Sequence, residues 1–352
     1  MSNVRKKVLV AMSGGVDSSL SCVLLLERGF EVAGVTMCLA KKGKESACPV
    51  DVAVKDARQI CRTLSIPHYV VDFSREFEEL VVEDFVSQYL KGKTPNPCVV
   101  CNRRLKFGKL LEYARHKGFD FLATGHYAKI EEKEGKYFLR RPKDRKKDQT
   151  YFLYDIGRDN LPYIIFPLSD FTKKEVKELS LKYNLHIAEE SESKDICFLP
   201  EGDYRKFLEE RISLDSPGFI VTTEGKIVGE HKGYFRYTIG QRKGLGVAHS
   251  RPLYVVAVHP ERNEVVVGER EALEARGLVA SHFQWLVDEL PSSVFAQVRY
   301  LQKEKACSVE IVGPDEIRVI FKEKVEMISP GQSVVLYSDD TVLGGGIIEE
   351  AF

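Results

Sequence analysis

The sequence has 352 residues, a length that suggests two or three domains. Hydrophobic residues make up 43% and charged residues 30%, a balance typical of a globular protein, and no stretch approaches the ~18 apolar residues of a membrane span. Lys plus Arg and Asp plus Glu both total 52, so net charge does not by itself indicate a nucleic-acid partner. The first apolar run is too short for a signal peptide, and with eight cysteines this predicts a reducing cytoplasm.

The first predicted elements lie in Lys7–Ser19, which reads KVLVAMSGGVDSS. This pattern predicts a buried strand, a tight glycine turn and the N-terminus of a helix. Such a turn directs several backbone N–H groups at one point, where the helix dipole also favours negative charge. Gly14 and Gly15 would let the backbone approach a phosphate closely. The loop resembles the pyrophosphate-binding loop of enzymes that cleave ATP to AMP and pyrophosphate, so we expect the protein to adenylate a substrate.

Polar side chains in the same loop are suited to phosphate chemistry. Asp17 could hold a Mg²⁺ ion, and the hydroxyl groups of Ser13, Ser18 and Ser19 could donate to phosphate oxygens. The alternative is an ordinary helix start, in which Asp17 and Ser18 only cap backbone N–H groups.

Strands then alternate with helices, which predicts βαβ units and a parallel sheet. Ligands of such sheets bind at the carboxyl ends of the strands, so Met37 and Gly125 are expected near an adenosine. For Met37 a place in the core is the alternative. The predicted strands are Phe30–Met37, His68–Val71 and Phe121–Thr124, and the predicted helices are Asp51–Leu64, Arg75–Leu90 and Asn102–Lys117.

Two cysteines lie in the segment KGKTPNPCVVCN, which ends at Asn102. We expect its prolines to exclude helix, so that an extended loop displays Cys98 and Cys101, with Asn102 capping the next helix. A third cysteine, Cys197, lies in SESKDICFLP. Cysteines near cations or helix N-termini are better nucleophiles, and basic residues follow Cys101 closely: Arg103, Arg104 and Lys106.

The cysteines also admit other interpretations. The spacing of Cys98 and Cys101 suits half a zinc site, but the sequence offers no second ligand pair. Cys48 is left undecided. The remaining cysteines lie in apolar patterns and are predicted to be buried: Cys22, Cys38, Cys61 and Cys307.

A basic run, RRPKDRKK at Arg140–Lys147, is followed by Tyr151 and Phe152. It is either a solvated face or a grip on an RNA backbone. The segment Gly233–Gly246 (GYFRYTIGQRKGLG) is a glycine-rich basic loop, for which RNA contact and a structural hairpin are both open.

The second half of the chain changes character. Thr172–Tyr183 predicts a helix with a Thr172–Glu175 capping box, and Asp203–Glu210 predicts another helix. Short alternating segments follow, which suggest β barrels. We predict a first domain at 1–202, a small middle domain at 203–273 and a C-terminal barrel at 274–352. The predicted strands are Leu253–His259, Glu264–Val267, Phe295–Tyr300, Ser308–Val312, Glu316–Phe321 and Ser333–Tyr337.

A series of motifs in fixed order resembles the bacterial tRNA-specific 2-thiouridylase family, MnmA, over nearly the whole chain. The motifs are AMSGGVDSS, TPNPCVVCNRRLKF, ATGHYAK, KDQTYFL, SKDICF, TIGQRKGLG, RYLQ and PGQ. The resemblance implies an α/β fold class: a Rossmann-like pyrophosphate-loop ATPase domain, a small central domain and a C-terminal β barrel. It implies ATP-dependent insertion of sulfur at position 2 of the wobble uridine, position 34, in the tRNAs for Lys, Glu and Gln, with a sulfur-delivering partner protein.

The resemblance also implies roles for individual residues. Cys197 would receive a persulfide sulfur, and Cys101 would be the partner nucleophile that resolves it, with a disulfide between them when sulfur is spent. ATP is assigned to Ala11, Met12, Ser13, Gly14, Gly15, Val16, Asp17 and Ser18, to Met37 and to Gly125. The target base is assigned to Asn96, Pro97 and Cys98. Contacts with tRNA are assigned to His126, Lys147, Asp148, Gln149, Arg299, Tyr300 and Gln332.

Cys98 departs from the family pattern, because well-known members carry an Asp there as the proposed acid/base. A thiol has an ordinary pKa near ~8.5 against ~3.9 for Asp, so it is no simple replacement. Cys98, Cys101 and Cys197 together could instead hold a 4Fe–4S cluster with one open iron that binds sulfide.

Two other functions are compatible with the loop. One is a pyrophosphate-loop ligase or amidotransferase for a small molecule, in which two thiols on a proline loop would have no role. The other is a non-catalytic protein that binds ATP and RNA as a sensor, against which the intact Asp17 and three site cysteines argue.

Overall fold

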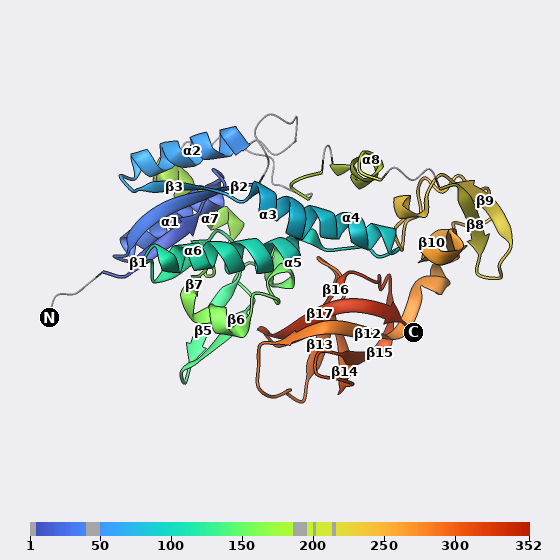
Figure 1. Ribbon diagram of the computed structural model, residues 1–352. Helices are drawn as coiled ribbons and strands as arrows, with labels where there is room; N and C mark the ends of the chain where they lie inside the picture. The colour runs from blue at the N-terminus through green and yellow to red at the C-terminus, as the bar shows by residue number, and fades with distance from the viewer. Residues whose placement is uncertain (1–4, 40–49, 186–195, 200–201, 213–215) are drawn as a thin grey trace. The chain divides into compact units, whose positions relative to one another are not determined.

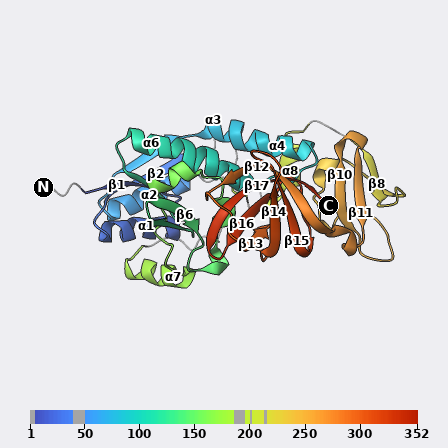
Figure 2. The same cartoon turned by 90° about the horizontal axis from the view of Figure 1, so that it is seen from below.

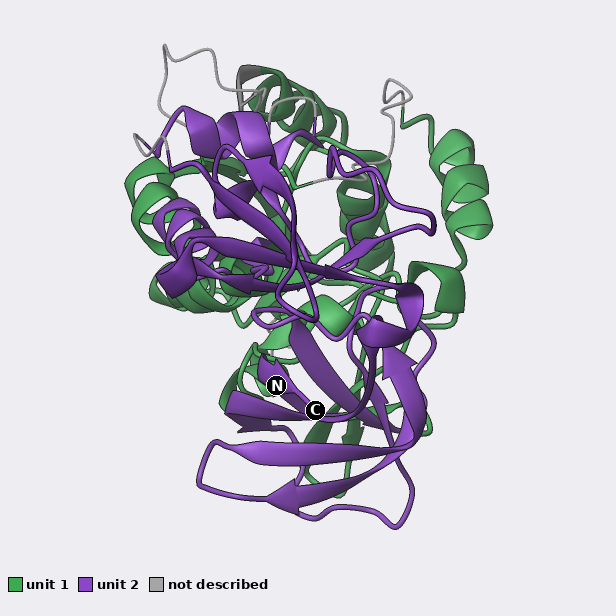
Figure 3. Ribbon diagram, turned by 90° about the vertical axis from the view of Figure 1, so that its right-hand side faces the viewer, with its two compact units in different colours: residues 1–81, 98–198, 339–342 green, residues 82–97, 199–338, 343–352 purple. Residues whose placement is uncertain are grey.

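The computed structural model describes residues 5–39, 50–185, 196–199, 202–212 and 216–352 (Figure 1). These residues form two compact units, each built from separate parts of the chain (Figure 3). Unit 1 holds residues 1–81, 98–198 and 339–342, and unit 2 holds residues 82–97, 199–338 and 343–352. The predicted boundaries after residues 202 and 273 stay predictions, since the units group residues by contact rather than by chain order.

Unit 1 contains a five-stranded parallel sheet of order β3-β2-β1-β4-β7, which confirms the predicted α/β class. The central strand β1 is buried over Val8–Val10, and Val8 and Val10 share a core with Cys22, Leu25 and Cys61. Burial on both faces explains why this strand reads as a continuous apolar run. The strands are β1 (Lys7–Ala11), β2 (Glu31–Cys38), β3 (His68–Asp72), β4 (Phe121–Thr124) and β7 (Ile164–Ile165), and the flanking helices are α1 (Val16–Glu27), α2 (Val50–Thr63) and α7 (Lys173–Lys182).

The helix predicted at Arg75–Leu90 is present but contains a π-helical turn in its middle. It consists of α3 (Ser74–Phe77), the π-helical segment η1 (Glu78–Val82) and α4 (Glu83–Leu90). Such insertions are rare and frequently mark functional sites.

The prediction of an extended loop through Pro97 was wrong. Helix α5 (Pro97–Cys101) begins at this proline, continues as the π-helical segment η2 (Asn102–Lys109) and ends as α6 (Leu110–His116). Proline is well suited to the first position of a helix, where its missing N–H needs no partner. Asn102 is therefore not a cap but lies inside the helix, where its buried Nδ2 donates to the carbonyl oxygen of Phe152 at 2.9 Å.

We expect Asn102→Ala to lower the free energy of unfolding by about 0.5–1.5 kcal/mol, because it removes a hydrogen bond made by a buried amide. Urea denaturation followed by circular dichroism measures this change. Arg104→Ala, at an exposed position two residues on, is the matched control. An unchanged midpoint for Asn102→Ala would show that this hydrogen bond does not stabilise the fold.

One hairpin of unit 1 was not predicted, because its strands are rich in charged residues. Strands β5 (Lys129–Lys133) and β6 (Lys136–Arg140) pair through a turn at Glu134-Gly135, where both residues have positive φ, 55° and 74°. This is the geometry of a tight hairpin turn. Thr341, the first residue of β17, pairs with Arg140 at the outer edge of this hairpin. Short 3₁₀ helices follow at η3 (Arg145–Lys147), η4 (Thr150–Phe152) and η5 (Arg158–Tyr163).

Unit 2 contains a four-stranded sheet of order β10-β11-β8-β9 around Ile220, Val255, Val265 and Val267. The loop Gly233–Gly246 contains no strand, so the structural hairpin that was the alternative to RNA contact is not formed. The strands are β8 (Gly218–Thr222), β9 (Ile227–His231), β10 (Tyr254–His259) and β11 (Glu264–Gly268), with helices α8 (Tyr204–Glu209), η7 (Tyr234–Arg236), η8 (Pro260–Arg262) and η9 (Arg270–Leu273).

The predicted C-terminal β barrel is confirmed in unit 2 (Figure 2). Its strands follow the order β12-β15-β14-β13-β16-β17, and pairing of β12 with β17 closes the circle. Leu278, Val319, Leu336 and Ile348 are fully buried inside it. The strands are β12 (Glu274–Trp285), β13 (Val294–Gln297), β14 (Lys305–Ile311), β15 (Ile317–Glu326), β16 (Ser333–Ser338) and β17 (Thr341–Ala351).

Strand β13 is shorter than the predicted Phe295–Tyr300. It ends at Gln297, so Arg299 and Tyr300 lie in the turn that follows. In the part of the chain that the structure describes, no helix is both long and apolar enough to cross a membrane.

Candidate active site

The predicted phosphate loop connects β1 to α1. Gly14 has φ +85°, a conformation that favours glycine, and a Cβ there would lie in tight contact, 3.2 Å from the carbonyl oxygen of Ala53. Gly15 occupies the N-cap position of α1 and no side chain caps the helix. The hydroxyl of Ser18 accepts from the N–H of Ser13 at 3.3 Å, inside the loop. Ser18 therefore satisfies a backbone N–H group, as the capped-turn alternative expects of it, and the assignment of the loop to phosphate stays a prediction.

The other predicted nucleotide residues lie on strands next to β1. Gly125 follows β4, and a Cβ there would lie 2.9 Å from the backbone nitrogen of Ser18, so only glycine allows this approach to the first turn of α1. Met37 is half-buried near the carboxyl end of β2, on the other side of β1. The structure therefore gathers these residues at one edge of the sheet, where parallel sheets bind ligands.

Asp17 has a partner that the sequence did not reveal. Nζ of Lys173, the first residue of α7, lies 2.7 Å from each of the two carboxylate oxygens of Asp17. The hydroxyl of Tyr127 donates to Oδ1 of the same carboxylate at 3.0 Å. A lysine after a helix cap is too common a pattern to have indicated this pairing. It adds Lys173 and Tyr127 to the candidate site.

The carboxylate of Asp17 suits Mg²⁺ by its chemistry, because Mg²⁺ is commonly held by one or two carboxylates together with substrate phosphates. Its side chain is 32% exposed, so it can be reached from solvent. When bound there, Mg²⁺ would supply positive charge to the phosphates. The ammonium group of Lys173, from which both oxygens accept, would compete with Mg²⁺ for this carboxylate.

Two of the predicted catalytic thiols lie on helix α5. Cys98 and Cys101 are three residues apart, a spacing that puts side chains on one face of a helix, with Cys98 exposed and Cys101 buried. Cys197 is exposed and precedes Phe198, whose ring packs edge-on against Phe77 with centroids 5.6 Å apart. All three cysteines belong to unit 1.

A metal centre made of these thiols is not assembled. Among the described residues, no group of three or more His, Cys, Asp or Glu side chains is arranged to hold a metal ion. The donors therefore do not fit an iron–sulfur cluster or a zinc ion in this conformation, and we derive no step through either. Of the cysteines predicted to be buried, Cys22, Cys61 and Cys307 are, whereas Cys38 is half-buried, and Cys48 lies outside the described residues.

Lys106 is the charged group that acts on both thiols of α5. Burial raises the pKa of Cys98 and of Cys101, and the positive charge of Lys106 opposes this rise by favouring both thiolates. Cys98 is exposed when its whole surface is considered, so the burial that raises its pKa acts mainly at the sulfur atom. Cys101 directly precedes the π-helical segment η2, in which hydrogen bonds run from residue i to residue i+5. Lys106 therefore lies about one helical turn after Cys101.

His126 is a neutral side chain in this environment. Burial, and secondarily the charge of Lys106, hold the pKa of His126 well below its ordinary value. Its Nδ1 lies 2.7 Å from the hydroxyl of Thr124, and its ring packs near those of Phe107 and Phe166 at centroid distances of 6.0 and 6.2 Å. The predicted tRNA contact of His126 would thus be made by an uncharged imidazole.

The basic run is largely neutralised by carboxylates of unit 1. Its arginines pair with acidic side chains in the combinations Arg140–Glu131, Arg141–Asp148 and Arg145–Asp340, and Lys143 pairs with Glu175. Tyr151 is buried, so it cannot stack on a base. These contacts favour a structural role for most of the run over a grip on RNA.

Gln149, a predicted tRNA contact, also holds the backbone of Tyr127, whose hydroxyl donates to Asp17. Its Oε1 accepts from the N–H of Tyr127 at 2.8 Å, and its own N–H donates to the carbonyl oxygen of Tyr127 at 3.0 Å. Asp148 is committed to Arg141 and to the hydroxyl of Thr150. The tRNA assignments of Lys147, Asp148 and Gln149 stay predictions.

In unit 2, Gln332 supports the segment that precedes the cysteines. Its Nε2 donates to the carbonyl oxygens of Thr94 at 2.9 Å and Pro95 at 3.2 Å. These two residues directly precede Asn96 and Pro97, which are assigned to the target base. Gln332 therefore orients the backbone of this segment, whether or not it also contacts tRNA.

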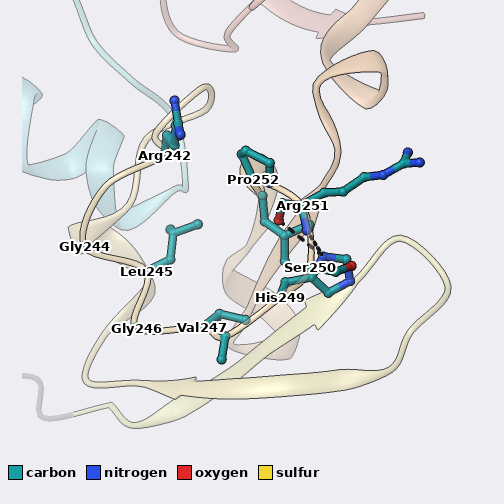
Figure 4. Close-up of a pocket in the computed structure, with 11 residues that line it drawn as sticks. Arg242, Gly244, Leu245, Gly246, Val247, His249, Ser250, Arg251 and Pro252 are labelled. Atoms are coloured by element: carbon teal, nitrogen blue, oxygen red, sulfur yellow. Dashed lines mark hydrogen bonds between the residues drawn. The ribbon is translucent and has the colours of Figure 1, made fainter.

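The basic loop of unit 2 borders an open hollow of about 670 Å³ within residues 242–253. Figure 4 shows Arg251 extending away from this hollow, and its guanidinium pairs with Glu269 at 2.8 Å. Leu245 and Pro252 are among its apolar lining residues. The hollow carries no cluster of acids, nucleophiles or stacked aromatic rings and is not a second active site.

Three family models match consecutive parts of the chain. They are described as the tRNA methyl transferase HUP domain at residues 6–201, the tRNA methyl transferase PRC-barrel domain at 205–269, and the aminomethyltransferase beta-barrel domain at 275–348.

Curated relatives match over nearly their full length. The tRNA-specific 2-thiouridylase MnmA 1 of Syntrophus aciditrophicus is 51% identical over 99% of this chain and 94% of its own. The tRNA-specific 2-thiouridylase MnmA of Carboxydothermus hydrogenoformans is 50% identical over 98% of both chains.

Solved structures are more distant. The U34-tRNA thiolase NcsA from Methanococcus maripaludis, with its [4Fe-4S] cluster, shares 19% identity at a TM-score of 0.36, over 59% of this chain and 67% of that chain. A 4-thiouridine synthetase–RNA complex with bound ATP shares 17% sequence identity at a TM-score of 0.38, over 59% of this chain and 50% of that chain. Both scores are too low to carry over any feature of those proteins.

Proposed function

Because this chain belongs to the tRNA-specific 2-thiouridylase MnmA family, we propose that it is a tRNA-uridine 2-sulfurtransferase. It replaces the C2 oxygen of uridine 34 with sulfur in the tRNAs for Lys, Glu and Gln, and consumes ATP. The observation that carries this proposal is the 51% identity over 99% of the chain, together with the glycine loop at the end of β1. An ATP-cleaving loop suits thiolation, for which the C2 oxygen must be activated, better than the methyl transfer named by the family models.

The C2 carbonyl of uracil is amide-like and lacks a good leaving group. Attack of this oxygen on the α-phosphorus of ATP forms the C2–O–AMP bond and releases pyrophosphate. The N–H groups of Gly14 and Gly15 and the N-terminus of α1 are suited to stabilise the departing pyrophosphate. The proposed ATP-binding residues are Ala11, Met12, Ser13, Gly14, Gly15, Val16, Asp17, Ser18, Met37 and Gly125.

Sulfur then replaces AMP. Cys197 carries a persulfide, and the thiolate of Cys101 attacks its inner sulfur, which forms a Cys101–Cys197 disulfide and expels hydrosulfide. Hydrosulfide attacks C2, the C2–O bond breaks, and AMP leaves with the bonding electrons. An external thiol must then reduce the disulfide. The exposed thiol of Cys197 suits a residue that is loaded by another protein, and the buried Cys101 suits one that is protected from oxidants.

The target base would be held by Asn96, Pro97 and Cys98, after it leaves the anticodon stack. Contacts with tRNA are proposed for His126, Lys147, Asp148, Gln149, Arg299, Tyr300 and Gln332. A cysteine desulfurase or a sulfur-relay protein would load Cys197. The enzyme would work in the cytoplasm, where its tRNA substrates are found.

The test is a thiolation assay on unmodified tRNA-Lys transcript with ATP and Mg²⁺, read as 2-thiouridine by mass spectrometry of the digested RNA. Metal-free protein receives a persulfide donor, and anaerobically reconstituted protein receives sulfide. We expect product from the metal-free protein. Product only from the reconstituted protein, together with bound iron, would replace the persulfide route by a cluster.

Absence of product from both preparations, with folded protein that binds tRNA, would overturn the thiolation proposal. AMP formation stimulated by a small acid rather than by tRNA would then indicate a small-molecule ligase or amidotransferase. Failure to form AMP under any condition would indicate a non-catalytic sensor of ATP and RNA.

A further inference from the structure

Lys173 is fixed at its backbone and extended at its side chain. It begins α7, whose capping box joins Thr172 and Glu175, and its own N–H donates to Oδ2 of Asp144 at 2.9 Å. The side chain alone can therefore move without disturbing the helix. Its ammonium group reaches Asp17, which lies 156 residues earlier in the chain, in the first turn of α1.

The ion pair between Lys173 and Asp17 lies where the phosphate loop joins the first turn of α1. The side chains of Lys173 and Asp17 are 18% and 32% exposed, so the pair is partly shielded but still reached by solvent. Gly125, which approaches Ser18 N, and Tyr127, which donates to Asp17, flank it from the end of β4. The ammonium group is thus held beside the place where phosphates would meet the N-terminus of α1.

Stability alone gives this pair little reason to exist. Ion pairs reached by solvent contribute about 0–1 kcal/mol to folding, and an acid at a helix N-terminus is already favourable without a partner. The pair has a clear use in nucleotide binding. Before ATP arrives, Lys173 neutralises Asp17; when the phosphates arrive, a cation that can turn toward them is needed, because lysine binds phosphate as a flexible point charge.

We propose that Lys173 is a nucleotide-binding residue, which holds Asp17 in the empty enzyme and transfers its ammonium group to the phosphates when ATP binds. This inference rests on ATP binding at the loop, one part of the proposed function. Release of Asp17 at the same moment leaves its carboxylate available to the Mg²⁺ that accompanies ATP. One side chain thereby links the binding of the nucleotide to the opening of the cation site.

The matched control lies next to it on the same helix. Lys174 is 86% exposed and faces Glu178 at 3.9 Å, so Lys174→Met removes the same charge from the same turn without touching the loop. Lys173→Met removes the ammonium group and keeps the bulk of the side chain, and Lys173→Arg keeps the charge. Thermal denaturation of each variant reports whether it folds.

The first readout is equilibrium binding of ATP in the absence of tRNA, at several Mg²⁺ concentrations. We expect Lys173→Met to bind ATP about 10- to 100-fold more weakly, the range for loss of a hydrogen bond to a charged group. Lys173→Arg should recover part of the loss, and Lys174→Met should bind as the wild type does. The second readout is tRNA-dependent AMP formation, in which the KM for ATP rises and the KM for tRNA stays unchanged.

Wild-type affinity for ATP in Lys173→Met, or a lower Mg²⁺ requirement with unchanged ATP affinity, would overturn the proposal, because Lys173 would then only neutralise Asp17. If Lys173→Met does not fold, wild-type affinity in Lys173→Ala together with weakened binding in Lys173→Arg would overturn it equally. Wild-type protein that binds ATP but never thiolates tRNA would count against the proposed function and leave this assignment intact.

Discussion

Replacing Cys197 by serine should abolish 2-thiouridine formation, with a loss of about 10³-fold or more, the scale expected when a nucleophile is removed. A hydroxyl cannot carry a persulfide, so no sulfur reaches the uridine. Affinities for ATP and tRNA should be unchanged, because Cys197 is exposed and lies outside the phosphate loop. The measurement is 2-thiouridine per tRNA under single-turnover conditions, alongside binding of both substrates. Full activity of Cys197→Ser would remove the persulfide route.

The matched controls are variants of Cys98, the other exposed thiol among the three predicted catalytic cysteines. Cys98→Ser should lose less than the ~10²-fold that an acid/base residue contributes, because burial raises the pKa of this thiol and keeps it protonated at neutral pH. Cys98→Asp should retain activity. Loss of thiolation together with loss of iron in Cys98→Asp would instead identify Cys98 as a cluster ligand.

Replacing Lys106 by methionine should slow thiolation at pH 7, because removal of its charge raises the pKa of Cys101 further and lowers the fraction of thiolate. The rate falls rather than rises, because a thiol is neutral below its pKa and becomes a nucleophilic thiolate above it. Activity of the wild type should therefore still rise with pH above about 8.5, the ordinary pKa of cysteine. The variant's profile should shift to higher pH, and raising the pH should restore much of its rate.

The rate of alkylation of Cys101 by iodoacetamide against pH, in protein that lacks Cys98 and Cys197, measures this pKa directly. Lys106→Arg should keep the wild-type profile, because it keeps the charge. Lys109→Met is the matched control on the same π-helical segment, since Lys109 pairs with Glu76 at 3.4 Å. A profile of Lys106→Met that coincides with the wild type would show that Lys106 does not act on the thiol.

Local patterns in the sequence were sufficient for the scaffold of the site. The apolar run of β1, the two glycines and the periodic apolar residues of α1 lie within about twenty residues, so each element is specified by its own neighbours. The order of the motifs, with Cys98, Cys101 and Cys197 among them, was sufficient to recognise the family.

Tertiary structure decided the contacts of the site. Lys173 and Asp17 are 156 residues apart and Gln332 and Thr94 are 238 apart, and no periodicity of the sequence relates such pairs. The helix through Pro97 also depends on context, because a proline read as a helix breaker is equally suited to the first helical position. Local propensity fixes where elements form, whereas packing fixes which distant side chains meet, and the chemistry of this enzyme depends on both.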